Sequence, residues 1–322
     1  VVVHALQALD AAGFDFSPYA NPATDEVENL VFVFAGRNYG YTRDPSNSLQ
    51  ATAYSLIHRA QRYTSTGGQF LENYTFCPEQ RGFTDSGTMA NIGICAHEHG
   101  HGLGALDLYD FSGMTSGAGR FSLMAYGAYG ATDGQRPFHP GPFSRELIGW
   151  ITPTVASLGT STVTLEPAES GANSVKLYPG GDTSSLEYFV LENRQPLGFD
   201  EDWTTAGLCP GLVIWHVDQD IVQWYRYYVN TLGVPPHQGV IVVEADGGFD
   251  MINPPMDYGE CSDTWTVGQT WDANSTPSSR LWDGSDSQLA VTVLDESDGA
   301  VVLAVRVGSS FKVFLPAVQG QD

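Results

Sequence analysis

Apolar and polar positions alternate between a helical and a strand-like pattern in the first part of the chain. In residues 1–12 the apolar side chains recur at helical spacing, and Gly13 follows as a natural stop, which predicts an amphipathic helix. Residues 29–36 form a short, continuous apolar run rich in Val and Phe, which is typical of a strand buried on both faces. Residues 53–60 fit a helix and a strand equally well.

Helical spacing returns at Thr88 and gives way to strands after about residue 150. Met89 and Ile92 fall on one side of the expected helix. Beyond it, short β-type runs are separated by Gly, Asn, Asp and Pro, which indicates a β-rich second half. These runs cover residues 161–167, 174–180, 187–195, 211–218, 239–245, 290–297 and 300–307. Residues 309–322 are expected to be a strand remnant followed by a tail or linker.

The composition allows a folded core and argues against anionic partners. With 322 residues, 42% of them apolar, the chain can bury a substantial core. Its 14 Lys and Arg against 37 Asp and Glu give a formal charge of −23, which repels phosphate backbones, so we expect no nucleic-acid partner. No apolar run is long enough for a membrane span, and the first residues lack the charged start of a signal peptide. We therefore expect a mature or trimmed form.

Four cysteines, Cys77, Cys95, Cys209 and Cys261, form an even set without a Cys-x-x-Cys pair. This favours disulfides in an oxidising compartment over a cysteine metal site, and therefore secretion. Their order along the chain suggests the pairs Cys77–Cys95 and Cys209–Cys261, although four cysteines allow three connectivities. Four buried free thiols are the alternative.

The stretch AHEHGHGLGALDLYD, which begins at residue 96, concentrates the candidate chemistry. Residues four apart lie on the same face of a helix, so His97 and His101 can direct ring nitrogens at one metal ion. A catalytic zinc needs a third protein ligand and an open position for water. Gly104 can end the helix and reverse the chain, so that Asp107 returns to the metal. The pattern His-Glu-x-x-His-x-x-Gly-x-x-Asp therefore predicts a zinc site.

Glu98, His99 and Asp110 belong to the same stretch but have other expected roles. Glu98 lies beside the metal and is expected to act as the general base. His99 is two residues away from each of the two ligand histidines, and each residue turns the helix by about 100°. It therefore points away from their metal and is expected beside the site or at the surface. For Asp110 three roles stay open: it could replace Asp107 as ligand, orient a ligand imidazole or cap the next turn. We favour the orienting role.

The motif resembles the zinc signature of the immune-inhibitor-A-type metallopeptidases, secreted zincins related to the metzincins. The likeness continues in residues 120–127 (RFSLMAYG), which resemble the family's Met-turn, and in residues 143–153, 187–200 and 211–220. The resemblance covers nearly the whole chain. It implies an α+β fold with a zincin-like catalytic domain over residues 1–150 and a β-rich part over residues 151–308 packed on it.

The resemblance also assigns roles outside the zinc motif. Met124 would lie beneath the zinc site as the Met-turn residue, where a thioether supplies an apolar floor for the histidines. Tyr126 resembles a Met-turn tyrosine whose phenol swings toward the metal, so it is a candidate oxyanion donor. Family members carry a propeptide that blocks the zinc, so we expect one to have been removed. His58 and His139 receive no role.

Calcium is the second metal that the resemblance suggests. Acidic loops could hold one or more structural calcium ions, although none matches an EF-hand. These loops cover residues 200–203, 244–250, 259–263 and 282–287. The segment at residues 21–29 lies where the family has an Asp-rich, Gly-containing turn, but it lacks the Gly and most of the Asp residues, which puts a metal there in doubt.

Together these residues predict a secreted zinc endopeptidase that acts on protein or peptide substrates and that we expect to be monomeric. Zinc would lower the pKa of its bound water from about 15.7 toward 7, and Glu98 would accept the proton and pass it to the leaving amine. A zincin-fold binding or adhesion module without catalysis stays open, although the intact Glu98 counts against it. A zinc hydrolase of a non-protein substrate also stays open. The aromatic-rich residues 218–230 are interpreted as a packed helix rather than as part of the cleft.

Overall fold

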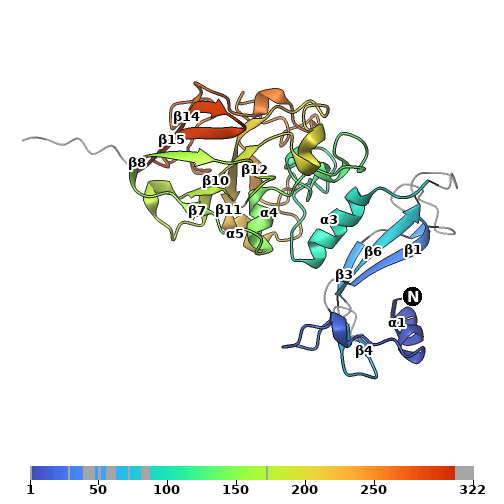
Figure 1. Cartoon of the computed structure of the whole chain (residues 1–322). Helices are drawn as coiled ribbons and strands as arrows, with labels where there is room; N and C mark the ends of the chain where they lie inside the picture. Colours follow the sequence, from blue (N-terminus) through green and yellow to red (C-terminus); the bar gives the residue numbers. More distant parts are fainter. Residues whose placement is uncertain are drawn as a thin grey trace, which may run out of the picture.

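The structure of the protein is a computed structural model that describes residues 2–27, 30–38, 48–49, 52–55, 63–71, 73–80, 88–171 and 173–308. Helix and sheet are mixed, so the fold is α+β, as predicted. Figure 1 shows two parts: a small N-terminal part that contains one sheet, on the right, and a larger β-rich body, on the left. Helix α3 (Ile92–Gly102), which carries the metal motif, lies between these two parts.

The N-terminal sheet has four strands in the order β2-β1-β6-β3. Strand β1 runs parallel to β2 and β6, whereas β3 runs antiparallel to β6. A separate hairpin joins β4 and β5. The strands are β1 (Leu30–Asn38), β2 (Ser48–Leu49), β3 (Thr52–Ser55), β4 (Tyr63–Thr64), β5 (Phe70–Leu71) and β6 (Asn73–Gln80).

Helix α1 (Val2–Ala11) covers one face of this sheet, and α3 covers part of the other. Leu6 of α1 is fully buried in a core that includes Phe34 and Phe76. On the opposite face α3 packs against β6 and β3 rather than against β1. Val31 and Val33 of β1 are therefore 42% and 68% exposed, and the prediction that this strand is buried on both faces is wrong.

The remaining expectations for the first part of the chain have mixed outcomes. The helix predicted over residues 1–12 is α1, and Gly13 follows it with a φ of +80°. The helix expected from Thr88 begins only at Ile92, because Met89 forms a β-bridge with Gln80. Of the ambiguous stretch 53–60, the first three residues belong to β3, and the rest lies outside the described residues.

Two sheets form the β-rich body. The first has five strands in the order β12-β11-β10-β9-β7, and the second has four in the order β13-β14-β15-β8. Their bounds are β7 (Thr154–Val155), β8 (Gly159–Leu165), β9 (Val175–Leu177), β10 (Glu187–Arg194), β11 (Gly211–Asp218), β12 (Val240–Val242), β13 (Thr270–Trp271), β14 (Leu289–Ser297) and β15 (Ala300–Val307). The seven strand runs predicted after residue 150 all coincide with strands of this body.

The five-stranded sheet is buried on both faces. Phe189 and Ile214 point into a core shared with the four-stranded sheet. Val190 and Trp215, on the opposite face, point into a core shared with the segment that follows α3, including Met124. The segment that follows α3 and the β-rich body therefore share one hydrophobic core across residue 150.

Short helices and two disulfides complete the described fold. Disulfides join Cys77 to Cys95 and Cys209 to Cys261, which is the connectivity that the sequence order suggested among three. The short helices are α4 (Pro142–Leu147), α5 (Gln219–Trp224) and the 3-10 turns Ser17–Tyr19, Gly119–Phe121, Tyr126–Tyr129, Pro179–Gly181, Gly198–Asp202 and Cys261–Asp263.

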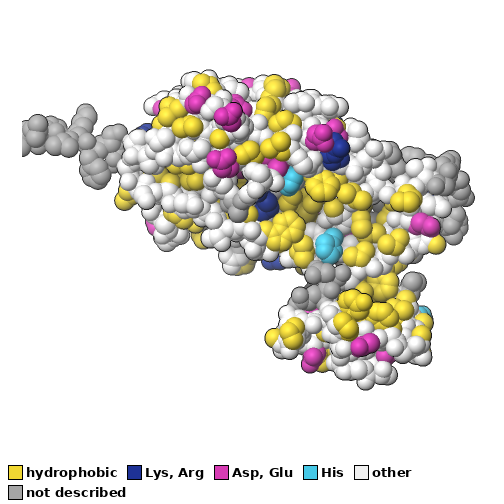
Figure 2. Space-filling view, viewed as in Figure 1, with side chains coloured by type: hydrophobic (Ala, Val, Ile, Leu, Met, Phe, Trp, Pro, Cys, Tyr) yellow, Lys and Arg dark blue, Asp and Glu magenta, His cyan; other side chains and the backbone are white. Residues whose placement is uncertain are grey.

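The surface is acidic without one dominant acidic block. In Figure 2 the Asp and Glu side chains are scattered over the visible face, and few Lys or Arg side chains accompany them. Among the described residues, no helix has the length and apolar character needed to cross a membrane. The expected linker at residues 309–322 lies outside the described residues.

Candidate metal centre

Helix α3 ends in a turn that carries the chain back toward the helix. The Gly104 amide donates to the carbonyl of His101 (3.0 Å), and the Ala105 amide donates to the carbonyl of Gly100 (2.9 Å), which is the hydrogen-bond pattern of a Schellman C-cap. Gly104 has a φ of +107°, a conformation that L side chains rarely adopt. The reversal expected at Gly104 is therefore present in the structure.

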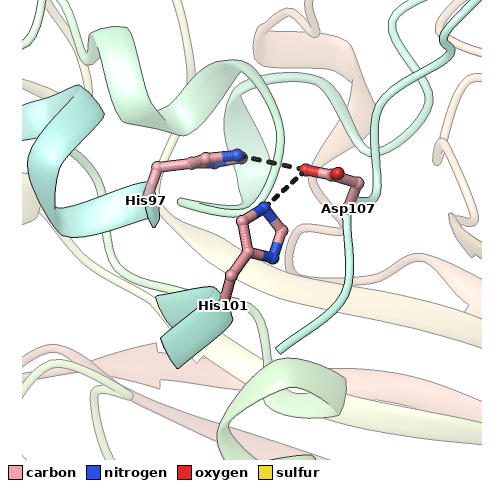
Figure 3. Close-up of side chains that lie close together, drawn as sticks. All are labelled: His97, His101 and Asp107. Atoms are coloured by element: carbon pink, nitrogen blue, oxygen red, sulfur yellow. Dashed lines mark ion pairs between the residues drawn. The ribbon is translucent and has the colours of Figure 1, made fainter. Parts of the chain in front are cut away.

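The turn places Asp107 against the two histidines of α3, as Figure 3 shows. Oδ1 of Asp107 lies 3.1 Å from Nε2 of His97 and 3.0 Å from Nε2 of His101. The His97 side chain is almost buried, whereas that of His101 is 22% exposed, so the group is reached from the solvent on the His101 side. The structure thus brings together the three residues that the sequence motif predicts as metal ligands.

Main-chain carbonyls fix the orientation of both imidazole rings. Nδ1 of His97 lies 2.9 Å from the Leu123 carbonyl oxygen, and Nδ1 of His101 lies 2.9 Å from that of Ala105. Because a carbonyl only accepts, each Nδ1 carries the hydrogen, and each neutral ring presents the lone pair of Nε2. These lone pairs face Oδ1 of Asp107, which is buried without a well-formed hydrogen bond within the described part of the chain. Acceptors that converge in this way need a cation between them.

A proton can serve as that cation when no metal is bound. Burial lowers the pKa of His101, but the Asp107 carboxylate outweighs burial and, with a smaller contribution from Glu98, raises that pKa to about 9. Burial raises the pKa of Asp107, yet the two histidines outweigh it and lower that pKa to about 2. A metal ion must displace this proton, so metal affinity should increase with pH.

Met124 lies against helix α3, which carries the two histidines of the candidate metal centre. Its side chain is 1% exposed, and a Cβ atom placed on Gly100 would come within 2.7 Å of its sulfur. The Met124 carbonyl accepts a hydrogen bond from the Leu108 amide (2.8 Å), next to the ligand Asp107. The segment that contains Met124 therefore contacts both the helix and the loop that supply the predicted metal ligands.

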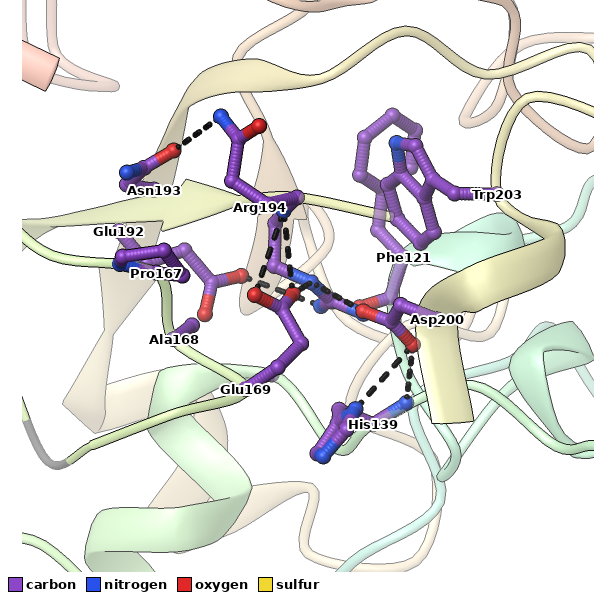
Figure 4. Close-up of polar contacts among 12 residues, drawn as sticks. Phe121, His139, Pro167, Ala168, Glu169, Glu192, Asn193, Arg194, Asp200 and Trp203 are labelled. Carbon is purple, nitrogen blue, oxygen red and sulfur yellow. Dashed lines mark hydrogen bonds and ion pairs between the residues drawn. The ribbon is translucent and has the colours of Figure 1, made fainter. Parts of the chain in front are cut away.

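A buried ionic cluster around Arg194 contacts the segment that contains Phe121 and Met124 (Figure 4). The Arg194 guanidinium is fully buried and contacts Asp200, Glu169 at 3.1 Å and Glu192 at 3.3 Å. It also donates to the Phe121 carbonyl at 2.9 Å. Burial raises the pKa of Asp200, but Arg194 outweighs burial and holds that pKa well below its usual range, so the pair is ionic at neutral pH.

Hydrogen bonds connect this cluster to a metal ligand. The His139 amide donates to Oδ1 of Asp200 (2.8 Å), the Leu123 amide donates to the His139 carbonyl (3.2 Å), and the Leu123 carbonyl accepts from His97. His139, which received no role from the sequence, therefore serves to link the cluster to the Met124 segment. His58 lies outside the described residues.

The comparison with protein families agrees with this geometry. Residues 57–151 match the family described as Immune inhibitor A peptidase M6, catalytic domain. The match supports an immune-inhibitor-A-like metallopeptidase family for this chain. The matched segment contains the two histidines, Asp107 and Met124. No match was found among curated proteins.

Two neighbours of the predicted ligands, His99 and Glu98, behave differently. His99 faces β6, where its Nδ1 lies 3.3 Å from Oγ1 of Thr75, and so it stays outside the metal group as expected. The Glu98 carboxylate acts electrostatically on the site, because its charge contributes to the raised pKa values of His101 and, after burial and Asp107, of Tyr109. The Glu98 charge therefore contributes to the electrostatic field at both residues.

Asp110 does not orient a ligand histidine, which corrects the role favoured from the sequence. Its carboxylate accepts hydrogen bonds from the amide and hydroxyl of Ser112 (2.7 and 2.6 Å), the amide and hydroxyl of Thr115 (3.1 and 2.9 Å) and the amide of Leu232 (3.1 Å). Main-chain carbonyls orient the histidines instead. Asp110 therefore caps the turn after the metal loop, one of the three roles left open.

Tyr109 is a neighbour of the site that the sequence analysis missed. Its ring centroid lies 6.1 Å from that of His97, and its pKa is raised first by burial and then by the charges of Asp107 and Glu98. The Tyr126 ring packs instead on Tyr129 and Tyr258, at 6.1 and 4.6 Å. The position of Tyr109, two residues after Asp107 on the returning loop, is the signal that could have identified it.

Proposed function

We propose that this chain is a secreted zinc-dependent endopeptidase whose metal ligands are His97, His101 and Asp107. The observation that carries the proposal is the convergence of two imidazole lone pairs and one buried carboxylate oxygen on one point. The family match supports a peptidase, and the arrangement of acceptors supports a metal in it. Proteins or peptides are therefore the proposed substrates.

The three side chains fit zinc in spacing and in chemistry. Ligand atoms about 2.0–2.2 Å from a tetrahedral zinc lie roughly 3.3 Å apart. The Nε2–Oδ1 separations of 3.0 and 3.1 Å need little adjustment to reach that value. Two imidazoles and one carboxylate are also a ligand set that catalytic zinc sites use, with one position left for water.

Zinc would supply the chemistry of a Lewis acid and lower the pKa of a bound water. Glu98, next to His97 on α3, is the proposed general base that accepts the proton of this water and returns it to the leaving amine. A phenol near the metal would donate to the oxygen of the scissile carbonyl as charge develops there. Tyr109 is better placed for this role than Tyr126, because its ring lies beside His97.

The test compares wild type with Glu98→Ala. Both proteins are loaded with zinc, their metal content is measured, and degradation of casein is followed with and without a chelator. We expect both to bind one zinc and the variant to degrade casein at least about a hundredfold more slowly than the wild type, because the proton acceptor is missing. Unchanged proteolysis by the variant would eliminate Glu98 as the base.

The zinc and casein measurements, together with an assay on simple activated esters, separate the two alternative functions. A binding or adhesion module without catalysis would bind zinc stoichiometrically in the wild type and degrade nothing. A hydrolase of non-protein substrates would also leave casein intact but would hydrolyse simple activated esters in a Glu98-dependent manner. The intact Glu98 favours the peptidase over the binding module, and the match to a peptidase family favours it over the hydrolase of non-protein substrates.

Secretion, assembly and domain organisation complete the proposal. The two disulfides fit an oxidising, extracellular environment. We propose a monomer that has lost a propeptide and that does not bind nucleic acid. We also propose the division into a catalytic domain over residues 1–150 and a β-rich part over residues 151–308, which pack together through the core around Met124 and Trp215.

A structural calcium ion is proposed at a second acidic group. Glu244 and Asp263 are 0% and 1% exposed, and their oxygens lie within 4.8 Å of each other and of Asp246. Oδ1 of Asp263 is buried and has no hydrogen-bond partner among the described residues. Calcium binds carboxylate and carbonyl oxygens in such groups. Two of the acidic loops singled out from the sequence, residues 244–250 and 259–263, supply these residues.

Calcium binding is tested by the thermal stability of the zinc-loaded protein as calcium is added. We expect the unfolding midpoint to rise with calcium and to change little with magnesium, which prefers a tighter octahedral site. The matched variant Glu244→Gln should lose most of the response. An equal response in the variant and the wild type would remove the proposed ion from this group.

A further inference from the structure

A continuous series of aromatic rings leads from the metal centre to the surface. The Tyr109 ring lies 6.1 Å from the ring of His97, and the Phe111 ring lies 4.7 Å from that of Tyr109. The Tyr228 ring follows at 5.5 Å from Phe111 in a T-shaped contact. We call Tyr109, Phe111 and Tyr228 the aromatic strip.

The outer part of the aromatic strip is open to solvent. Phe111 and Tyr228 are each 48% exposed, and Tyr227 beside them is 69% exposed. The sequence suggested that residues 218–230 form a packed helix, but α5 ends at Trp224, which is itself 77% exposed. The expectation of a packed helix is thus wrong for the aromatic half of the segment, which presents its rings outward.

The exposed rings are held on a fixed backbone. The buried Asn230 side chain donates to the Leu108 carbonyl (2.9 Å), and the Leu232 amide donates to Oδ1 of Asp110 (3.1 Å). The Phe111 amide in turn donates to the hydroxyl of Thr231 (3.4 Å). These contacts tie the Tyr228 segment to the loop that follows the ligand Asp107, so the rings keep their place relative to the metal.

We propose that the aromatic strip is a substrate subsite that binds a large apolar or aromatic side chain of the polypeptide being cleaved. The inference rests on the proposed peptidase function. Rigid aromatic side chains bury a large apolar area at a low cost in conformational entropy, and they contact other rings favourably. Because ring contacts continue without interruption from His97, a polypeptide at the metal lies within reach of the strip.

Peptide substrates that differ at one position test the subsite. One Phe is moved through each position of an otherwise Gly, Ser and Ala sequence, and the cleaved bond is identified by mass spectrometry. The best Phe peptide is then compared with its Ser counterpart in wild type, Phe111→Ala and Tyr228→Ala. Leu294→Ala is the matched control, because Leu294 is also 48% exposed but lies on β14 of the four-stranded sheet.

We expect the wild type to cleave the Phe peptide about tenfold more efficiently than the Ser peptide, in kcat/KM. Phe111→Ala and Tyr228→Ala should lose most of this preference, because cleavage of the Phe peptide falls much more than cleavage of the Ser peptide, and Leu294→Ala should keep the preference and both rates. Binding is measured separately in the Glu98→Ala background, where the Phe peptide should bind more weakly once Phe111 or Tyr228 is replaced.

The contrary outcomes are distinct. A preference for Phe that survives both substitutions contradicts the subsite, and so does an equal loss for the Phe and Ser peptides, which would mean that the rings only support the fold. Concentration-dependent self-association of wild type that Tyr228→Ala abolishes would assign the strip to a second copy of the chain and contradict the inference. If zinc-loaded wild type cleaves no peptide at all, the proposed function fails first.

Discussion

Gly100 leaves space for the thioether of Met124 under the metal-binding helix: a Cβ atom at position 100 would lie 2.7 Å from the Met124 sulfur. The helix can therefore approach the turn closely enough for His97 to donate to the Leu123 carbonyl. A glycine inside a helix costs about 1 kcal/mol relative to alanine, and this contact explains the glycine at position 100.

Gly100→Ala should lower the free energy of unfolding by about 1–3 kcal/mol, because the extra methyl group overpacks the buried contact with Met124. Gly102→Ala is the control, since among the described residues its Cβ would meet only Oγ1 of Thr75, at 3.4 Å. There the higher helix propensity of alanine should leave stability unchanged or raise it by up to about 1 kcal/mol. Urea unfolding of both variants measures the difference, and equal stabilities would contradict the packing explanation.

Arg194→Met should destabilise the protein by about 3–5 kcal/mol, because it leaves the buried Asp200 carboxylate without its guanidinium partner, whereas Glu192 keeps its ion pair with Arg145. Arg136→Met removes a comparable ion pair with Glu201, whose side chain is 65% exposed, and should cost less than about 1 kcal/mol. Denaturant unfolding in the metal-free state measures both. A small loss of unfolding free energy in Arg194→Met would show that the cluster does not stabilise the Met124 segment as described.

Without calcium, stability should fall as the pH rises through neutrality. Burial and the neighbouring charge of Asp263 raise the pKa of Glu244 to about 9, and burial, with a contribution from nearby carboxylates, raises that of Asp263 to about 7. A carboxyl group whose folded pKa is raised holds a proton that the unfolded chain releases. The contribution of this protonated carboxyl group to stability is therefore complete below its pKa in the unfolded chain. It is lost as the pH rises through its pKa in the folded protein.

Thermal unfolding between pH 5 and 9 measures this dependence, with Glu244→Gln as the control that keeps the shape but cannot ionise. We expect the wild type to lose more stability than the variant over this range and calcium to reduce the difference, because the ion compensates the buried charges. Identical pH profiles of wild type and variant would contradict the raised pKa of Glu244.

The convergence of His97, His101 and Asp107, the proposed metal ligands, could be predicted from the sequence because it follows local geometry. The spacing of His97 and His101 on one helix and the turn at Gly104 determine where Asp107 returns, and all of this lies within eleven residues. The strand runs of the second half were accessible for the same reason, since β-type runs and turn residues are local signals.

Features that depend on distant parts of the chain were not accessible. The exposure of Val33 depends on where α3 crosses the sheet, and the capping role of Asp110 depends on Leu232, more than a hundred residues away. The exposure of the Tyr227 and Tyr228 rings likewise depends on the hydrogen bond from Asn230 to the Leu108 carbonyl, more than a hundred residues away. Periodicity along the chain carries no information about such contacts.

The zinc content of two matched variants, Asp107→Asn and Asp110→Asn, tests the proposed metal centre most directly. Both substitutions remove one negative charge and keep the side-chain shape, and both proteins are dialysed against a zinc buffer before the metal is quantified. We expect Asp107→Asn to retain far less than one zinc, and Asp110→Asn to retain one zinc with reduced thermal stability, because Asp110 caps a turn. If Asp107→Asn retained one zinc per protein while Asp110→Asn lost its zinc, the assignment of Asp107 as the third ligand would be contradicted.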